Sequence, residues 1–298
     1  TELEYKGNLF PNQIISHKKE VDKITFYARN NVALQISFLR DSVLRFRYAV
    51  EQDFEPDFSY AISEDATYGY NHLEIKELDG HFSMYTSKLE VRVSKSDLRL
   101  AILDLDGNIL NEDELGFHWE ESYEHGGNIV KMSKFSQESE SFYGMGDKPS
   151  QLNLRGKRIH NWATDQYAFG KDRNPLYKSV PFYIGMHHKT AYGIFFDNTF
   201  KTHFDFCNER RNITSFWADG GEMNYYFIYG PSISQVVVGY TDLTGKPELP
   251  PLWVLGFHQC KWSYYPESKV KEIANKFREL SIPCDAIYLD IDYMDGFR

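Results

Sequence analysis

The chain has 298 residues, of which 42% are hydrophobic and 16% aromatic, and its net charge is −10. This length and apolar content suffice for a sizeable core and predict one or two domains. The negative charge argues against a nucleic-acid partner, since phosphate backbones are bound by clustered basic side chains. No run of about 18 apolar residues occurs, which argues against a membrane-spanning helix and a membrane partner.

The cysteine and glycine patterns favour neither a metal nor a cofactor. The three cysteines are odd in number and have no C-x-x-C spacing, which argues against a disulfide framework and a zinc site. Gly144 and Gly146 lack the third glycine of a dinucleotide-binding loop, and the acidic turn at residues 104–108 lacks the later glutamate of a calcium loop. We therefore predict no cofactor and no metal site. Free cysteines lean towards a reducing space, and the compartment is unknown, with a bacterial cytoplasm or periplasm as the working guess.

Residues 23–229 show the patterns of many short strands. Residues 44–48 and residues 89–94 each alternate apolar with charged or polar side chains, which is the period of half-buried strands. Asp106 and Gly107 form a hairpin turn signal between two apolar runs. Many short strands separated by regular turns predict a β-sandwich.

The last stretch, residues 250–298, has the pattern of a strand, a helix and a second strand. Residues 253–257 are an apolar run of strand length that follows two prolines. Residues 266–280 repeat apolar side chains at helical spacing, and Pro283 ends that pattern. Residues 286–289 are a second apolar run, typical of a strand that is covered on both faces. Together these segments predict a βαβ unit.

Aromatic and acidic side chains follow the two strands of this predicted unit. They are Trp262, Tyr264 and Tyr265 after the first strand, and Asp290, Asp292 and Asp295 after the second. The carboxyl ends of strands in α/β sheets and barrels carry the ligand site. Carboxylates bind pairs of hydroxyls and aromatic faces cover sugar rings, so these side chains fit a polyhydroxylated ligand. An alternative stays open, in which Asp290 and Asp292 cap the next helix or pair with Lys261 and Arg298.

Two segments carry a resemblance to a known family. LPPLWVLGFHQCKWSYY, which ends at Tyr265, and IPCDAIYLDIDYMDGFR, which ends at Arg298, closely resemble glycoside hydrolase family 31, the family of retaining α-glucosidases and α-xylosidases. In that family this stretch is the first βαβ unit of a catalytic (β/α)8 barrel. The resemblance implies an N-terminal β-sandwich domain with a substrate loop at residues 1–245. It implies that residues 246–298 are the start of the catalytic barrel, which is truncated and incomplete here.

The same resemblance implies four substrate-binding residues. Asp290 would hold hydroxyls of the non-reducing sugar, Ile291 would form an apolar wall beside it, and Trp262 would line the innermost subsite. Asp165, in a Trp-x-x-Asp pattern, would be a loop carboxylate that contacts the sugar on the leaving-group side, although the loop pattern alone also allows a turn cap. In the family the nucleophile and the acid/base are aspartates on later barrel strands. We therefore expect no catalytic residue in this chain and place both after Arg298.

The activity that the resemblance implies is that of an exo-acting retaining α-glycosidase. Our first hypothesis is an α-glucosidase that hydrolyses terminal non-reducing α-linked glucose, with an oligosaccharide or α-glucoside as substrate. The 298 residues alone would be inactive, and Asp292 would be structural, tying the strand end to its neighbours. An α-xylosidase or transglucosidase of the same family stays open, and so does a non-catalytic carbohydrate-binding β-sandwich module. The sequence leaves open whether the protein is a homo-oligomer.

Overall fold

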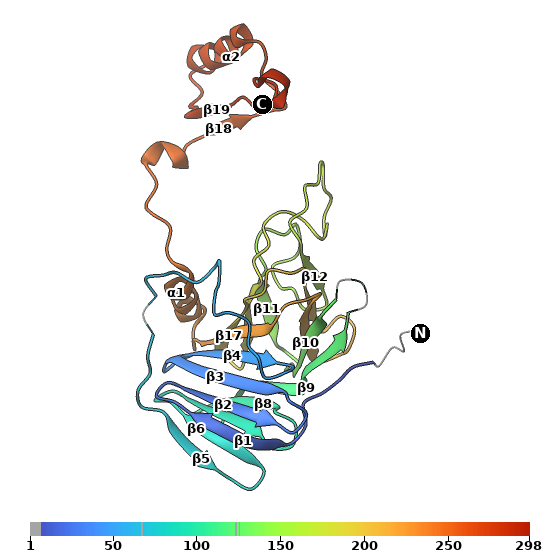
Figure 1. The fold of residues 1–298 in the computed structure, drawn as a ribbon. Coiled ribbons are helices and arrows are strands. Elements are labelled where there is room, and N and C mark those ends of the chain that lie inside the picture. Colours follow the sequence, from blue (N-terminus) through green and yellow to red (C-terminus); the bar gives the residue numbers. More distant parts are fainter. Residues whose placement is uncertain (1–6, 67, 123, 125) are drawn as a thin grey trace. The chain divides into compact units, whose positions relative to one another are not determined.

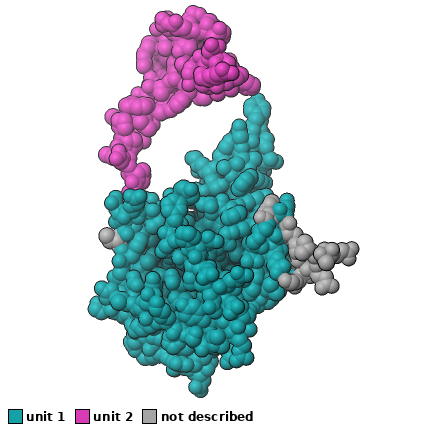
Figure 2. Space-filling model, viewed as in Figure 1, with its two compact units in different colours: residues 1–245 teal, residues 246–298 magenta. Residues whose placement is uncertain are grey.

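The computed structural model describes residues 7–298 except residues 67, 123 and 125. The chain divides into two compact units, which we call unit 1 (Thr1–Gly245) and unit 2 (Lys246–Arg298) and which Figure 2 shows in different colours. Unit 1 is built mainly from strands, whereas unit 2 contains an α-helix between two short strands.

Unit 1 contains an eight-stranded sheet (Figure 1), in which the strand order is β1-β2-β3-β4-β17-β14-β13-β11. Its strands are β1 (Ile14–Lys19), β2 (Lys23–Ala28), β3 (Ala33–Arg40), β4 (Val43–Ala49), β17 (Met223–Tyr229), β14 (Thr190–Phe196), β13 (Phe182–His187) and β11 (Ser141–Gly144). All seven pairings are antiparallel. Because β4 pairs with β17, segments from the two ends of unit 1 lie side by side.

A nine-stranded sheet forms the second layer of unit 1, in the order β12-β15-β16-β10-β9-β8-β7-β6-β5. Its strands are β12 (Arg158–Asn161), β15 (Thr202–Phe206), β16 (Ile213–Ala218), β10 (Asn128–Phe135), β9 (Ile109–Glu121), β8 (Leu100–Asp104), β7 (Leu89–Ser94), β6 (His81–Tyr85) and β5 (Glu74–Glu77). These pairings are antiparallel as well. Two such sheets around one core confirm the predicted β-sandwich.

Aromatic rings connect the two sheets through the core. Tyr48 of β4 stacks on Phe117 of β9, with ring centroids 4.5 Å apart. Phe216 of β16 meets Tyr225 of β17 edge-on, at a centroid distance of 5.5 Å. All four side chains are buried. The apolar members of the period-2 patterns at residues 44–48 and 89–94 lie in this core, which is the physical reason for those patterns.

A helix covers the outer side of the eight-stranded sheet. α1 (Ile233–Thr244) begins after Ser232, whose hydroxyl accepts a hydrogen bond from the Gln235 amide, while the Gln235 side chain accepts from the Ser232 amide. This capping box satisfies backbone donors that a helix start leaves free. Tyr240 of α1 stacks on Phe182 of β13, with ring centroids 3.9 Å apart. The helix therefore gives this sheet a second, smaller apolar layer.

Unit 2 consists of a strand, a helix and a strand. β18 (His258–Cys260) and β19 (Ala286–Tyr288) pair in parallel, and α2 (Glu267–Glu279) connects them, which confirms the predicted helix. A short 3₁₀ helix, η1 (Leu252–Leu255), precedes β18, and another, η2 (Asp295–Phe297), follows β19. Within the described residues, no helix is long and apolar enough to cross a membrane.

The first strand of unit 2 does not lie where the sequence predicted it. Most of the apolar run at residues 253–257 belongs to η1, and β18 starts after it. The Val254 amide donates to the Pro251 carbonyl at 3.0 Å. The Gly256 amide donates to the Trp253 carbonyl at 3.0 Å. These tight turns satisfy the backbone locally. The prediction was wrong because a short apolar run does not by itself distinguish a strand from a helical turn.

An ion pair is buried inside unit 1. Lys134 Nζ lies 2.6 Å from Asp113 Oδ1, and neither side chain is more than 1% exposed. The second carboxylate oxygen of Asp113 accepts from the Leu100 amide at 2.9 Å. Lys134 also donates to the hydroxyl of Tyr225 at 3.4 Å. Because a buried charge without a partner is very unfavourable, the two charges depend on each other.

We expect Asp113→Ala to lower the free energy of unfolding by about 3–5 kcal/mol, because it leaves the Lys134 ammonium buried without a counter-charge. Urea-induced unfolding of the 298-residue chain measures this. The matched control is Glu138→Ala, which breaks an equally short but exposed ion pair with Arg211 and should cost at most about 1 kcal/mol. Equal costs for the two variants would contradict the prediction.

Candidate functional site

Unit 2 brings three of the four predicted site residues to one edge of its sheet. Trp262 follows β18, and Asp290 and Ile291 follow β19. The strands are parallel and in register at Cys260 and Tyr288, so both following segments leave the same edge. This is the edge at which α/β sheets bind ligands.

A side-chain hydrogen bond links these two segments. The Ser263 hydroxyl donates to the Asp292 carboxylate, which connects the residue after Trp262 to the segment after β19. The two ion pairs on α2, Lys269 with Glu272 and Lys271 with Glu267, do not involve this carboxylate. This hydrogen bond agrees with the structural role that the family resemblance implies for Asp292.

The chemistry available at this edge is an apolar surface beside a carboxylate. Trp262 is 73% exposed and Ile291 is 42% exposed, so both present apolar surface. Asp290 is partly buried and has a left-handed backbone with φ 65°, a conformation that aspartate tolerates better than most residues. A ring, an aliphatic side chain and a carboxylate together suit a ligand with both C–H faces and hydroxyl groups.

Side chains of β18 form hydrogen bonds to the segment that follows it and to β19. The Gln259 side chain donates to the hydroxyl of Tyr264 at 2.8 Å, and Tyr264 is buried. His258 Nδ1 lies 2.9 Å from the hydroxyl of Tyr288, which joins β18 to β19. The Gln259 hydrogen bond thus ties the segment that contains Trp262 back to β18, and the His258 contact joins β18 to β19.

The fourth predicted residue, Asp165, lies in unit 1, in the loop after β12. It is exposed, and its Oδ1 accepts a hydrogen bond from the Tyr177 hydroxyl at 2.9 Å. The Gln166 amide donates to the same hydroxyl at 3.0 Å. Tyr177 therefore orients both the carboxylate and the neighbouring backbone. That Asp165 acts together with the residues of unit 2 stays a prediction.

Further contacts pin the Asp165 loop to unit 1. Asn174 accepts from the His160 amide at 2.9 Å and donates to the Arg158 carbonyl at 2.8 Å. Asp172 accepts from Ser150 at 2.9 Å, and it pairs with Lys157 at 3.1 Å. The hydrogen bond from Lys157, with that from Ser150, lowers the pKa of the Asp172 carboxyl. The loop is therefore closed on β12 and anchored to the segment before it.

Two histidines and an aspartate are linked by hydrogen bonds where this loop leaves β12. His160 Nδ1 lies 2.6 Å from His203 Nδ1, and His203 Nε2 lies 2.9 Å from Asp219 Oδ1. Because a carboxylate only accepts, His203 donates from Nε2, and its neutral ring accepts at Nδ1 from His160. Burial and then the neighbouring His203 lower the pKa of His160 to about 4. Among the described residues, no group of three or more His, Cys, Asp or Glu is arranged to hold a metal ion.

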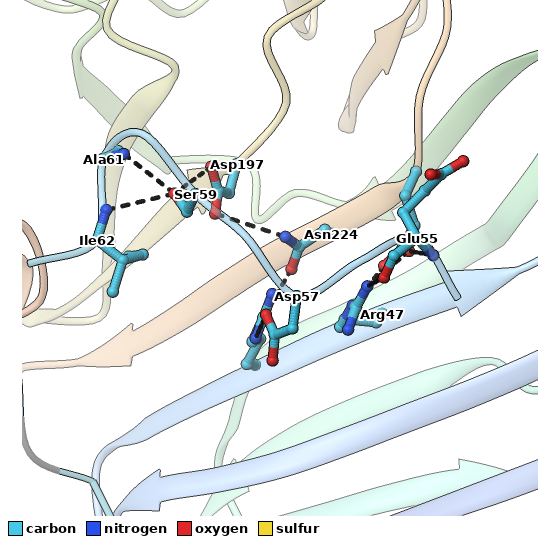
Figure 3. Close-up of polar contacts among 10 residues, drawn as sticks. Arg47, Glu55, Asp57, Ser59, Ala61, Ile62, Asp197 and Asn224 are labelled. Carbon is cyan, nitrogen blue, oxygen red and sulfur yellow. Dashed lines mark hydrogen bonds and ion pairs between the residues drawn. The ribbon is translucent and has the colours of Figure 1, made fainter. Parts of the chain in front are cut away.

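Two arginines of β4 hold the segment that follows this strand against the sheet (Figure 3). Arg47 forms a buried ion pair with Glu222 at 2.6 Å and donates to the Glu55 carbonyl at 2.7 Å. Arg45 pairs with Asp57 at 2.8 Å. Burial lowers the pKa of Arg47, but the hydrogen bond and charge of Glu222 outweigh it, so the pKa is raised overall.

Asp197, at the end of β14, fixes the next turn of the same segment (Figure 3). It accepts from the Ser59 hydroxyl at 3.0 Å, and Ser59 in turn accepts from the Ala61 and Ile62 amides. Burial raises the pKa of the Asp197 carboxyl. The sequence did not single out Asp197, because only the strand pairing brings it beside Ser59, 138 positions away.

Comparison with known proteins decides the family. The profile of the glycosyl hydrolase 31 N-terminal galactose mutarotase-like domain matches residues 33–205, and that of the family 31 TIM-barrel domain matches residues 247–298. The chain belongs to glycoside hydrolase family 31. This confirms the resemblance seen in the sequence, and it confirms a β-sandwich followed by the start of a (β/α)8 barrel.

Individual proteins match between 58% and 96% of the chain. Alpha-glucosidase 2 of Bacillus thermoamyloliquefaciens is 35% identical over 285 residues, which cover 95% of this chain and 35% of that protein. An alpha-glucosidase of Saccharolobus solfataricus is 34% identical over 172 residues, covering 58% of this chain and 25% of that protein. A family 31 dextranase of Flavobacterium johnsoniae, solved with isomaltotriose, superposes with a TM-score of 0.87 at 33% identity and covers 96% of this chain and 34% of that chain. The chain thus spans about a third or less of the length of these relatives.

We expect the stability of the chain to fall as the pH drops from about 6.5 to about 4, partly because of His160. The folded-state pKa of about 4 lies below the ordinary value of about 6.5, so between them the unfolded chain binds a proton that the folded chain does not. His160→Gln removes this titration and should make the loss of stability on acidification smaller. Urea midpoints at about pH 7 and about pH 4.5 measure it.

The control for this prediction is His72→Gln, which replaces an exposed histidine that is not hydrogen-bonded to His160 or His203. It should keep the dependence of the wild-type protein on pH. If acidification shifts the urea midpoints of both variants and of the wild type equally, His160 does not contribute to the pH dependence of stability.

Proposed function

We propose that the complete protein is an exo-acting retaining α-glucosidase that releases terminal non-reducing α-linked glucose. The observation that carries this proposal is the match of 95% of the chain to an alpha-glucosidase at 35% identity. The edge of the unit 2 sheet supports it, because Trp262, Asp290 and Ile291 lie there together.

Each of the four predicted site residues has a role in binding the substrate in this proposal. The Asp290 carboxylate accepts hydrogen bonds from hydroxyls of the non-reducing glucose. Trp262 covers the C–H face of the ring in the innermost subsite, and Ile291 is the apolar wall beside the carboxylate. Asp165, oriented by Tyr177, contacts the sugar on the leaving-group side.

The chemical step needs residues beyond these four. A retaining glycosidase uses two carboxyl groups about 5 Å apart, one as nucleophile and one as general acid and base. We place both on later strands of the barrel, after Arg298, so that Asp290 and Asp292 bind and support rather than react. This mechanism requires neither a metal nor a cofactor, and the 298 residues alone are expected to be inactive.

The experiment that tests the proposal is a panel of nitrophenyl α-glycosides with the complete polypeptide. The α-glucoside should be the best substrate, with retention of the anomeric configuration in the released glucose. An α-xyloside belongs in the panel because one relative, of Lactiplantibacillus pentosus, is an alpha-xylosidase. If all the glycosides are inert, the protein is not a glycosidase of this kind.

We expect Asp290→Ala in the complete protein to lower kcat/KM for the nitrophenyl α-glucoside by about 100-fold or more. Removing a carboxylate that accepts from sugar hydroxyls leaves those hydroxyls unpaired in the bound state, which costs a few kcal/mol. The matched control is Asp295→Ala, which removes an exposed carboxylate five residues further on and should change kcat/KM by less than about threefold. An unchanged kcat/KM for Asp290→Ala would rule out the role of Asp290 in binding the sugar hydroxyls.

A further inference from the structure

Trp262 and Asp290 lie on two segments that continue beyond the sheet of unit 2. We call residues 261–265 the first segment and residues 289–294 the second segment. The parallel ladder between β18 and β19 ends after three pairs of residues, and neither segment belongs to a strand or a helix. A ring and a carboxylate bind the same sugar unit only if their separation is fixed. Beyond the ladder, a contact between the two segments is needed to fix it.

One side-chain hydrogen bond provides such a contact. The Ser263 hydroxyl donates to the Asp292 carboxylate. Ser263 directly follows Trp262, and Asp292 lies two positions after Asp290. The structure describes every residue of unit 2, and within this unit no other side-chain hydrogen bond joins the two segments. A hydroxyl that donates to a charged oxygen forms one of the stronger hydrogen bonds in proteins.

The first segment is held at both of its ends. It starts directly after β18, and α2 begins after Pro266. The hydroxyl of Tyr264, whose side chain is buried, accepts a hydrogen bond from the Gln259 side chain at 2.8 Å. These contacts lie on either side of Trp262 and Ser263. The hydrogen bond of Ser263 therefore fixes the part of the segment that the other contacts leave free.

The second segment forms a turn around Asp292. The Met294 amide donates to the Ile291 carbonyl at 3.2 Å, which closes this turn. No side chain caps the 3₁₀ helix η2 that follows. Within the completely described unit 2, the side chain of Asp290 forms no hydrogen bond or ion pair. Of the two neighbouring carboxylates, that of Asp292 is thus engaged by Ser263, and that of Asp290 is available to a ligand.

We propose that Ser263 is a positioning residue, whose hydrogen bond to Asp292 holds the Trp262 ring and the Asp290 carboxylate at the separation that one glucose unit needs. The proposal rests on the function proposed above, in which Trp262 and Asp290 bind the non-reducing glucose. Ser263 does not touch the sugar and acts through Asp292. Without the hydrogen bond, the two segments move independently, and the ring and the carboxylate contact the same sugar less often.

The test uses variants of the complete protein and the nitrophenyl α-glucoside. Ser263→Ala removes the donor and should lower kcat/KM about tenfold, which is the usual effect of losing a hydrogen bond to a charged group. Ser263→Thr keeps a hydroxyl at this position and should stay within about threefold of the wild type. Asp292→Asn keeps an oxygen that accepts the hydrogen bond, so it should lower kcat/KM less than Asp292→Ala does.

The matched control is Ser268→Ala. It removes an exposed hydroxyl of α2 that forms no side-chain hydrogen bond within the described unit 2. Its kcat/KM should change by less than about twofold. Ser263→Ala and Ser268→Ala remove the same atom from the same unit, so the difference between them measures the hydrogen bond to Asp292.

A double-mutant cycle separates positioning from unrelated losses. If Ser263 acts through Asp292, adding Ser263→Ala to Asp292→Ala should lower kcat/KM by less than about twofold further. Multiplied losses in the double variant would overturn the proposal, and so would an unchanged kcat/KM of Ser263→Ala. If Ser263→Ala lowers kcat/KM only at temperatures at which it also unfolds, the hydrogen bond merely stabilises the fold, and the proposal is overturned as well.

A binding measurement keeps this inference separate from the proposed function. If the complete protein hydrolyses no glycoside, the proposed function fails, and calorimetric titration with glucose tests Ser263. Glucose binding that Ser263→Ala weakens about tenfold and Ser268→Ala leaves unchanged would support the positioning role. Equal glucose binding by the wild type and Ser263→Ala, or no binding by the wild type, would overturn it.

Discussion

The carboxamide of Asn174 is the contact on which the loop of unit 1 depends. β12 is a four-residue strand at the edge of its sheet, so one side of its backbone has no neighbouring strand. Asn174 takes the place of that neighbour, because it accepts from the His160 amide and donates to the Arg158 carbonyl. The loop that contains Asp165 is thereby closed on the strand from which it starts. Its course follows from the edge of the sheet.

Buried polar groups in unit 1 are of two kinds. Lys134 and Asp113 satisfy each other inside the sandwich, and their pairing fixes how β10 meets β9. Asn161 and Thr202 are as deeply buried, yet they have no partner within the described residues.

The sequence predicted the elements that depend on contacts between residues close together in the chain. α2 lies where apolar spacing indicated a helix, since the hydrogen bonds of a helix stay within its own segment. The alternation of residues 44–48 identified a strand, but no local pattern states which strand pairs with it. The pairing of Asn161 with Thr202 joins residues 41 positions apart in the chain, so no local sequence pattern could predict it. The prediction of a strand at residues 253–257 failed because a short apolar run is compatible with several backbone conformations.

The strands and the helix of unit 2 have few contacts that cover them within the unit. Its two strands have three residues each, and α2 has no buried residue within the unit. Parallel strands are stable where helices and further strands cover them, and Phe257 and Tyr288 are each 49% exposed here. A closed barrel would bury such side chains and hold the ends of β18 and β19 rigidly. Binding groups need placement to within about 0.5 Å, and a closed barrel gives strand ends that precision. In our proposal Trp262 and Asp290 bind sugar there, and the family resemblance assigns the reacting carboxyl groups to later strands.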